Sequence, residues 1–164
     1  MLRLLMISVL LAVSAPAQAD WQKTKWGMSP SDLRASTDAI LKPSDEERRR
    51  YGLPALGTPE LKSVYVAGEF TFIAYYLFQN DKLRAVSLHG NPKDSVGIIV
   101  SLRSQYGPAT REYRSSGSTC PTTLLEWVGG GRENDVRFVT TDCYETKHHS
   151  IVLTYMMPRL NPGL

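Results

Sequence analysis

The sequence predicts an α+β fold in which an antiparallel sheet of about six to seven strands carries helices on one face. Along the 164 residues, short helix signals alternate with runs of β-branched and aromatic residues, in the approximate order α-βββ-α-ββββ. Two connections between strand runs, Asn80-Asp81 and Gly129–Gly131, have the composition of hairpin turns. Because a helix followed by a strand meander occurs twice, the order is compatible with an α-βββ pseudo-repeat.

Composition and charge exclude several classes of protein. The chain is 42% hydrophobic and 21% charged, which is ordinary for a globular domain. The chain contains 19 lysines and arginines and 16 aspartates and glutamates, so the net charge is +3. Nucleic-acid binding needs basic residues clustered on one face, and so small a surplus does not supply them. We therefore expect no nucleic-acid partner, and a single α+β domain over residues 20–164.

Residues 1–19 are typical of a secretory signal peptide. Arg3 supplies the basic start, Leu4–Val13 is an unbroken apolar run, and Ala17-Gln18-Ala19 has the small residues that precede a cleavage site. Such a run reaches only ~15 Å as a helix, half of a ~30 Å hydrocarbon core. No cysteine near residue 20 offers a lipid-attachment site. We expect a mature chain that begins at Asp20, has no stable membrane span, and is periplasmic, or secreted if the source is not Gram-negative.

Three helical segments are predicted. Ser29 is suited to cap a short helix that begins at Pro30 and ends near residues 35–37. Ser44–Arg50 has acids first and bases last, which favours a second short turn. The clearest helix is Pro92–Tyr106, with Asn91 as its cap. We expect its apolar stripe to consist of Val96, Ile99, Val100, Leu102 and Tyr106.

Six to seven strands are predicted from runs of apolar and β-branched residues, at Leu61–Ala67, Phe70–Phe78 and Leu83–His89 and then near Thr110–Tyr113, Thr122–Val128, Val136–Thr141 and Ile151–Met157. The turn at Asn80-Asp81 sets a register in which paired positions sum to 161. This register gives the second and third of these strands two largely apolar faces. A single layer of helices covers only one face of a sheet, so the other needs a different cover.

One face of this hairpin carries Ile73, Tyr75, Val86 and Leu88, and we expect it to pack under the helix Pro92–Tyr106. The other face carries Phe72, Tyr76, Phe78 and His89. The second half of the chain, a dimer mate or a partner must cover it. If it is open, these four residues form the candidate binding surface, because aromatic side chains with a polar tip suit interfaces.

Cys120 and Cys143 are the two cysteines of the chain, and in an exported protein such a pair predicts a disulfide. If the glycine-rich loop turns near residues 131–132, paired positions sum to about 263 and Cys120 lies opposite Cys143. The alternative is a metal site, because cysteine and histidine ligands suit zinc or copper. Its candidate ligands are Asp142, Cys143, Glu145, His148 and His149. No zinc-finger or HExxH spacing occurs, and adjacent histidines in a strand point to opposite faces.

The sequence predicts no catalytic residue and no cofactor. It contains neither a GxSxG elbow nor a GxxxxGK[ST] phosphate loop nor a GxGxxG fingerprint. The segment Ser116–Cys120 offers hydroxyls and a thiol, but no base stands at a motif spacing from it. His89 can pair with Asp94 or with a tyrosine, although a histidine at a strand end is more often structural.

Three motifs carry a resemblance to known proteins. They are Trp26–Pro30 (WGMSP), Phe78–Leu88 (FxNDKLxxVxL) and Gln105–Thr110 (QYGPAT). With them the chain resembles small exported bacterial proteins of unassigned function. Its helix-then-meander layout is also similar to the BamE outer-membrane assembly lipoproteins and to the β-lactamase inhibitory proteins. The lipidated cysteine of BamE is missing, and no functional residue is carried over from either family.

These observations lead to three hypotheses about function. The first is a non-enzymatic envelope protein that binds a protein partner or an envelope component through an aromatic face of its sheet. The second is a periplasmic carrier of a small ligand or a metal. The third is a hydrolase with an unrecognised site. An exposed aromatic cluster favours the first, a closed apolar pocket the second, and a perturbed histidine in a cleft the third.

Overall fold

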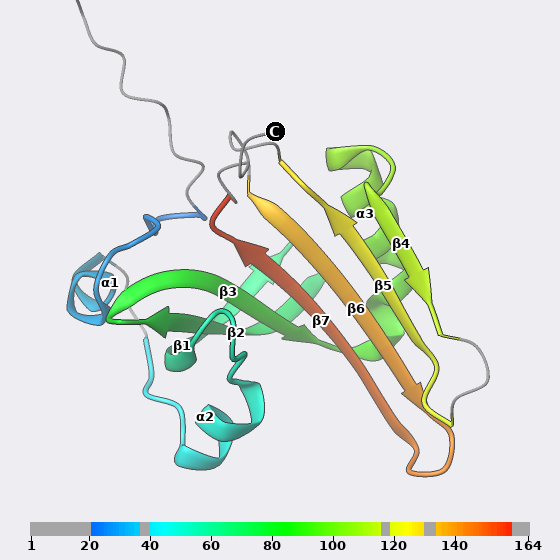
Figure 1. Cartoon of the computed structure of the whole chain (residues 1–164), viewed down its shortest axis with the longest axis horizontal. Helices are drawn as coiled ribbons and strands as arrows, with labels where there is room; N and C mark the ends of the chain where they lie inside the picture. Colours follow the sequence, from blue (N-terminus) through cyan, green and yellow to red (C-terminus); the bar gives the residue numbers. More distant parts are fainter. Residues whose placement is uncertain (1–20, 37–39, 116–118, 130–133, 159–164) are drawn as a thin grey trace, which may run out of the picture.

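The computed structural model describes residues 21–36, 40–115, 119–129 and 134–158. Within these ranges, seven antiparallel strands form one sheet, accompanied by three α-helices and a short 3-10 helix (Figure 1). The predicted α+β class is confirmed. The predicted signal peptide, residues 1–19, lies outside the described ranges. No helix in those ranges has the length and apolar character that a membrane crossing requires.

The sheet joins two meanders through their last strands, in the order β1-β2-β3-β7-β6-β5-β4. Strands β3 and β7 pair at the centre, so each meander contributes one outer strand, β1 or β4. The elements are α1 (Pro30–Ser36), α2 (Asp45–Tyr51), β1 (Thr58–Ala67), β2 (Phe70–Gln79), β3 (Lys82–Gly90), the 3-10 helix η1 (Pro92–Asp94), α3 (Ser95–Tyr106), β4 (Arg111–Arg114), β5 (Thr122–Trp127), β6 (Asp135–Cys143) and β7 (His148–Met156).

Local signals in the sequence set the helix starts. The Ser29 hydroxyl accepts a hydrogen bond from the backbone N–H of Asp32, at 3.2 Å, as the first turn of α1 requires. Helix α2 begins with a reciprocal capping box. The Glu47 N–H donates to the Ser44 hydroxyl, and the Ser44 N–H donates to the Glu47 carboxylate at 2.7 Å.

A bulge corrects the predicted register of β2 and β3. Asn80 and Asp81 form the predicted two-residue turn, both with positive φ, and next to the turn Phe78 pairs with Leu83 as expected. Beyond the bulge, the paired positions sum to 162, so Ile73 faces His89 instead of Leu88. A shift of one residue moves side chains to the other face of the sheet. The predicted partners of Ile73 and Tyr75 are therefore wrong.

The two faces of the sheet bury different residues, and we name them by their helices. The back face carries the main core and lies against α3, which stands behind β4–β6 in Figure 1. The front face lies against α2, where Tyr51 contacts Tyr75 with ring centroids 4.5 Å apart. Helices therefore cover parts of both faces, whereas the sequence predicted them on one.

Helix α3 meets the back face through Ile98 and Leu102, which are buried with Phe72 and Leu88. Val96 and Val100, part of the predicted stripe, are exposed, so that part of the prediction is wrong. The reason lies at Gly97. A Cβ there would stand 3.0 Å from the Phe70 ring, so the helix turns this small residue toward the sheet.

The disulfide Cys120–Cys143 is present, and its register is the predicted one. Trp127 pairs with Val136 and Thr122 with Thr141, so paired positions sum to 263 along the β5–β6 hairpin. By strand alternation Cys143 shares the front face with Thr141. The bond closes the end of this hairpin that lies opposite its glycine-rich loop.

Removal of the disulfide should lower the free energy of unfolding by about 3 kcal/mol, because the bond restricts the unfolded chain across a separation of 23 residues. Urea unfolding of the oxidised protein and of the Cys120→Ser/Cys143→Ser variant measures the difference. Equal stability of the two proteins, or full labelling of the native protein by a thiol reagent, would contradict the bond.

Candidate functional site

Three of the four predicted binding-surface residues belong to the core. Phe72, Tyr76 and Phe78 are only 3–4% exposed and lie in the back-face core. The Tyr76 hydroxyl lies 3.0 Å from the Ser63 hydroxyl, and its ring meets Trp21 edge-on. The same chain therefore covers this face. Phe72, Tyr76 and Phe78 are thus not an open binding surface, and the prediction that α3 covers the opposite face of the hairpin is wrong.

Tyr76→Ala should lower the free energy of unfolding by about 3–5 kcal/mol, as expected for truncation of a buried aromatic side chain. Tyr76→Phe keeps the ring and loses the hydrogen bond to Ser63, so its cost should be about 1 kcal/mol. Tyr113→Ala serves as the control, because that ring is 61% exposed. A melting temperature that falls no further for Tyr76→Ala than for this control would show that Tyr76 is not core.

His89, the fourth predicted residue, lies on the front face under α2. Its ring centroid is 4.4 Å from that of Tyr51 and 5.1 Å from that of Tyr75. Burial lowers the His89 pKa to about 4, so the imidazole is neutral at pH 7. Its Nε2 lies 3.1 Å from the Ser87 hydroxyl, but Ser87 is only 2% exposed and offers a substrate no open nucleophile.

A carboxylate at the start of α2 fixes this helix to the sheet. Glu47 accepts hydrogen bonds from the Lys62 ammonium at 2.6 Å and from the Tyr75 hydroxyl at 2.8 Å. These hydrogen bonds lower the Glu47 pKa to about 2. The bond from Lys62 has the largest effect, and the bond from the Ser44 N–H has the next largest. Burial, with the adjacent Glu47, raises the Tyr75 pKa. Helix α2 is thus a fixed wall beside the front face.

Stability should fall by about 2 kcal/mol between pH 7 and pH 5 because of His89. The unfolded chain takes up a proton below about pH 6.5, whereas the folded chain resists protonation until about pH 4. The Glu47 pKa is about 2 in the folded chain, so protonation of this carboxylate lowers the stability only below about pH 4.5. Urea unfolding at both pH values should show this loss in the native sequence and its absence in His89→Gln. The same loss in the variant would assign it to other groups.

Beyond α2, a row of apolar side chains crosses the front face. Strand pairing places Val152 beside His89, and Val139, Leu124 and Tyr113 follow on the next three strands. Val152, Val139 and Leu124 are half-buried among their neighbours and belong to neither core cluster. No described helix lies over this row, and Figure 1 shows strands β5–β7 uncovered on the side away from α3.

A second, polar row runs alongside the apolar one. Pairing aligns Arg111, Glu126 and Arg137 on the same face. The Arg137 Nε donates to the Glu126 carboxylate at 2.8 Å, and the Arg111 guanidinium lies 3.9 Å from the other carboxylate oxygen. Two guanidinium groups share one nearly buried carboxylate, so this row carries excess positive charge.

A groove of about 430 Å³ connects the row to α2. His89 and Val152 line it from the sheet, and Arg50 and Tyr51 line it from the helix. The Arg50 guanidinium lies 5.8 Å from the centroid of the Tyr51 ring, which keeps a cation at this wall. The apolar row, the polar row and this groove together form what we call the front-face surface.

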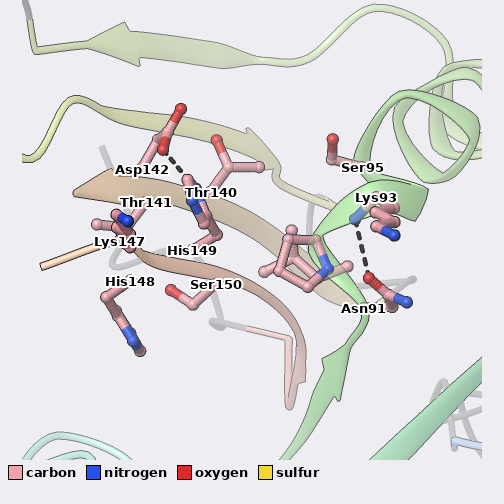
Figure 2. A pocket seen from close by; sticks show the side chains of 12 residues that line it. Asn91, Lys93, Ser95, Thr140, Thr141, Asp142, Lys147, His148, His149 and Ser150 are labelled. Carbon is pink, nitrogen blue, oxygen red and sulfur yellow. Dashed lines mark hydrogen bonds and ion pairs between the residues drawn. The ribbon is translucent and has the colours of Figure 1, made fainter. Parts of the chain in front are cut away.

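A separate cleft of about 620 Å³ lies between the start of α3 and the end of the β6–β7 hairpin (Figure 2). His149 Nδ1 stands 2.5 Å from Asp142 across the two strands, and His148, the next residue, points from the other face. In the described part of the chain, no group of three histidine, cysteine or acidic side chains is arranged to hold a metal ion. The geometry thus gives no support to the metal alternative at His148 and His149.

The chain matches no protein-family model, no curated protein and no solved structure. The resemblance carried by Trp26–Pro30, Phe78–Leu88 and Gln105–Thr110 remains an expectation.

Reasoning from the sequence did not find the front-face surface. The signal was present in β7, where the half-buried Ser150 and Val152 alternate with the buried Ile151 and Leu153. Similar outward valine and leucine residues occur in β6 and β5. They become a continuous row only through strand pairing across the sheet.

Proposed function

We propose that this chain is an exported binding protein that holds an acidic protein partner on its front-face surface. The observation that carries the proposal is the apolar row Tyr113–Leu124–Val139–Val152, which the described chain leaves uncovered. Contiguous apolar side chains that remain partly exposed in the folded chain are typical of interaction sites. The proposed binding surface therefore lies on the opposite side of the sheet from Phe72.

Charge supports an acidic partner. Arg50 stands at one end of the row, and Arg111 and Arg137 stand toward the other. Glu126, the carboxylate between the last two, is already engaged by both. Carboxylates of a partner would meet arginines beside an apolar centre, which is the usual arrangement of a protein interface.

The disulfide and the N-terminal segment support an envelope location. A disulfide is stable outside the cytoplasm, and its presence agrees with the signal-peptide features of residues 1–19. The partner is then an envelope protein or another exported protein. The periplasm is the compartment that we propose, and a secreted protein is the alternative if the source is not Gram-negative.

A photo-reactive amino acid at Val139 should cross-link the partner in intact cells, whereas one at the exposed Val100, on the opposite side, should not. With the purified partner, Tyr113→Ala should weaken binding about tenfold or more, as an exposed aromatic anchor would. Arg111→Gln should weaken it less and reduce its dependence on salt.

The exposed Val100 is the control for the cross-linking, and an arginine on α1 is the control for the affinity. Arg34→Gln changes an exposed arginine on α1 and should leave the affinity within twofold. Equal cross-linking from Val100 and Val139, or an affinity that Tyr113→Ala does not change, would overturn the proposal.

A further inference from the structure

A cavity of about 130 Å³ lies between α3 and the back face of the sheet. Residues of β1, β2, β3 and β7 line it on one side, and residues of α3 line it on the other. An apolar cavity of roughly 150 Å³ can hold one benzene molecule. The space under α3 is therefore about the size of one six-membered ring.

Helix α3 turns an unexpected stripe of residues toward this cavity. Ile98, Ser101, Leu102 and Gln105 line it, at the spacing of one face of a helix. Two of these four residues are polar, whereas two valines of the same helix are exposed. A helix that only fills a core turns its valines inward and its polar side chains outward. The orientation of α3 thus brings hydrogen-bonding groups to a cavity that is otherwise apolar.

The two polar side chains stand at the mouth of the cavity. Ser101 and Gln105 are exposed, so the cavity is open to solvent on their side. Among the described residues, neither side chain has a hydrogen-bond partner. A hydroxyl and a carboxamide each donate and accept hydrogen bonds, so together they suit a ligand with a hydroxyl group.

The interior of the cavity is aromatic and uncharged. Four aromatic side chains line it: Tyr65, Phe70, Phe72 and Tyr155. The ring centroids of Tyr65 and Phe72 are 6.2 Å apart. Burial raises the Tyr155 pKa, so this phenol is neutral at pH 7. Of the described residues that line the cavity, none is acidic, basic or a histidine. A charged ligand would lose its hydration there without compensation, so the lining favours a neutral one.

We propose that this cavity binds a small neutral aromatic molecule with one hydroxyl group, a phenol in chemical class. Its ring lies against Phe70 and Phe72 and beneath Leu102, and its hydroxyl group meets Ser101 and Gln105 at the mouth. Aromatic rings pack favourably edge-to-face or offset against one another, and four of them line this cavity. The inference concerns the back face and is independent of the proposed protein partner on the front-face surface.

Phenol is titrated into the oxidised exported protein, and the methyl resonances of the protein are followed by NMR. We expect saturable shifts at Ile98, Leu102 and Leu153, with a dissociation constant of about 1 mM. Benzoate has the same ring with a negative charge and should bind at least about tenfold more weakly, because no cation lines the cavity. Equal binding of phenol and benzoate, or no saturable shift at these three residues up to about 20 mM phenol, would overturn the proposal.

Two variants that occupy the cavity separate it from other surfaces. Ala67→Leu adds bulk inside, and Ser101→Phe places a ring at the mouth, so each should weaken phenol binding at least about tenfold. Ser101 is exposed, so the second variant tests the site even where Ala67→Leu costs stability.

Each variant has a matched control outside the cavity. Ala35→Leu changes an exposed position of α1, and Ser104→Phe changes an exposed position of α3 that does not line the cavity. Both controls should stay within about twofold of the native affinity. Binding that survives both cavity variants, or that the controls weaken equally, would contradict the site. Urea unfolding of each variant checks that the fold is retained.

Discussion

A single bulge between β2 and β3 determines which residues this protein buries on each side of its sheet. Leu83 and Ala85 are two positions apart and would share a face in a regular strand. With the bulge, Leu83 enters the back-face core, whereas Ala85 packs on the front face with Leu77. His89 consequently lies on the front face beneath Tyr51, and Leu88 lies on the back face near α3.

The helices cover the two faces unequally, and the open surface follows from this. Helix α3 and the segment containing Trp21 enclose the back face. Helix α2 has 7 residues and is held at its start by Glu47, so it covers the front face near β1–β3. Strands β4–β7 then present their front side chains without a described helix over them. A short helix on a wide sheet is therefore the structural origin of the proposed binding surface.

Interactions close in sequence could be predicted, and those that depend on packing could not. The Ser44–Glu47 capping box and the Asn80-Asp81 turn are readable because every group involved lies within a few residues. The disulfide register was also correct, since β5 and β6 pair without a bulge. The β2–β3 bulge was not predicted, because its benefit is the burial of Leu83 and Ala85 in two different cores. The orientation of α3 likewise depends on Phe70, a residue on a distant strand.

The disulfide lies beside the cleft of Figure 2, at the end of the β5–β6 hairpin. Cys143 follows Asp142 in β6, and pairing places these two residues opposite His148 and His149. Fixing Cys143 to Cys120 restrains the end of β6, and with it the Asp142–His149 pair that forms one wall of the cleft. The front-face row crosses the same strands nearer their centres, where Val139 pairs with Val152. The cleft thus depends on a covalent bond at the edge of the fold, whereas the front-face surface depends on regular strand pairing.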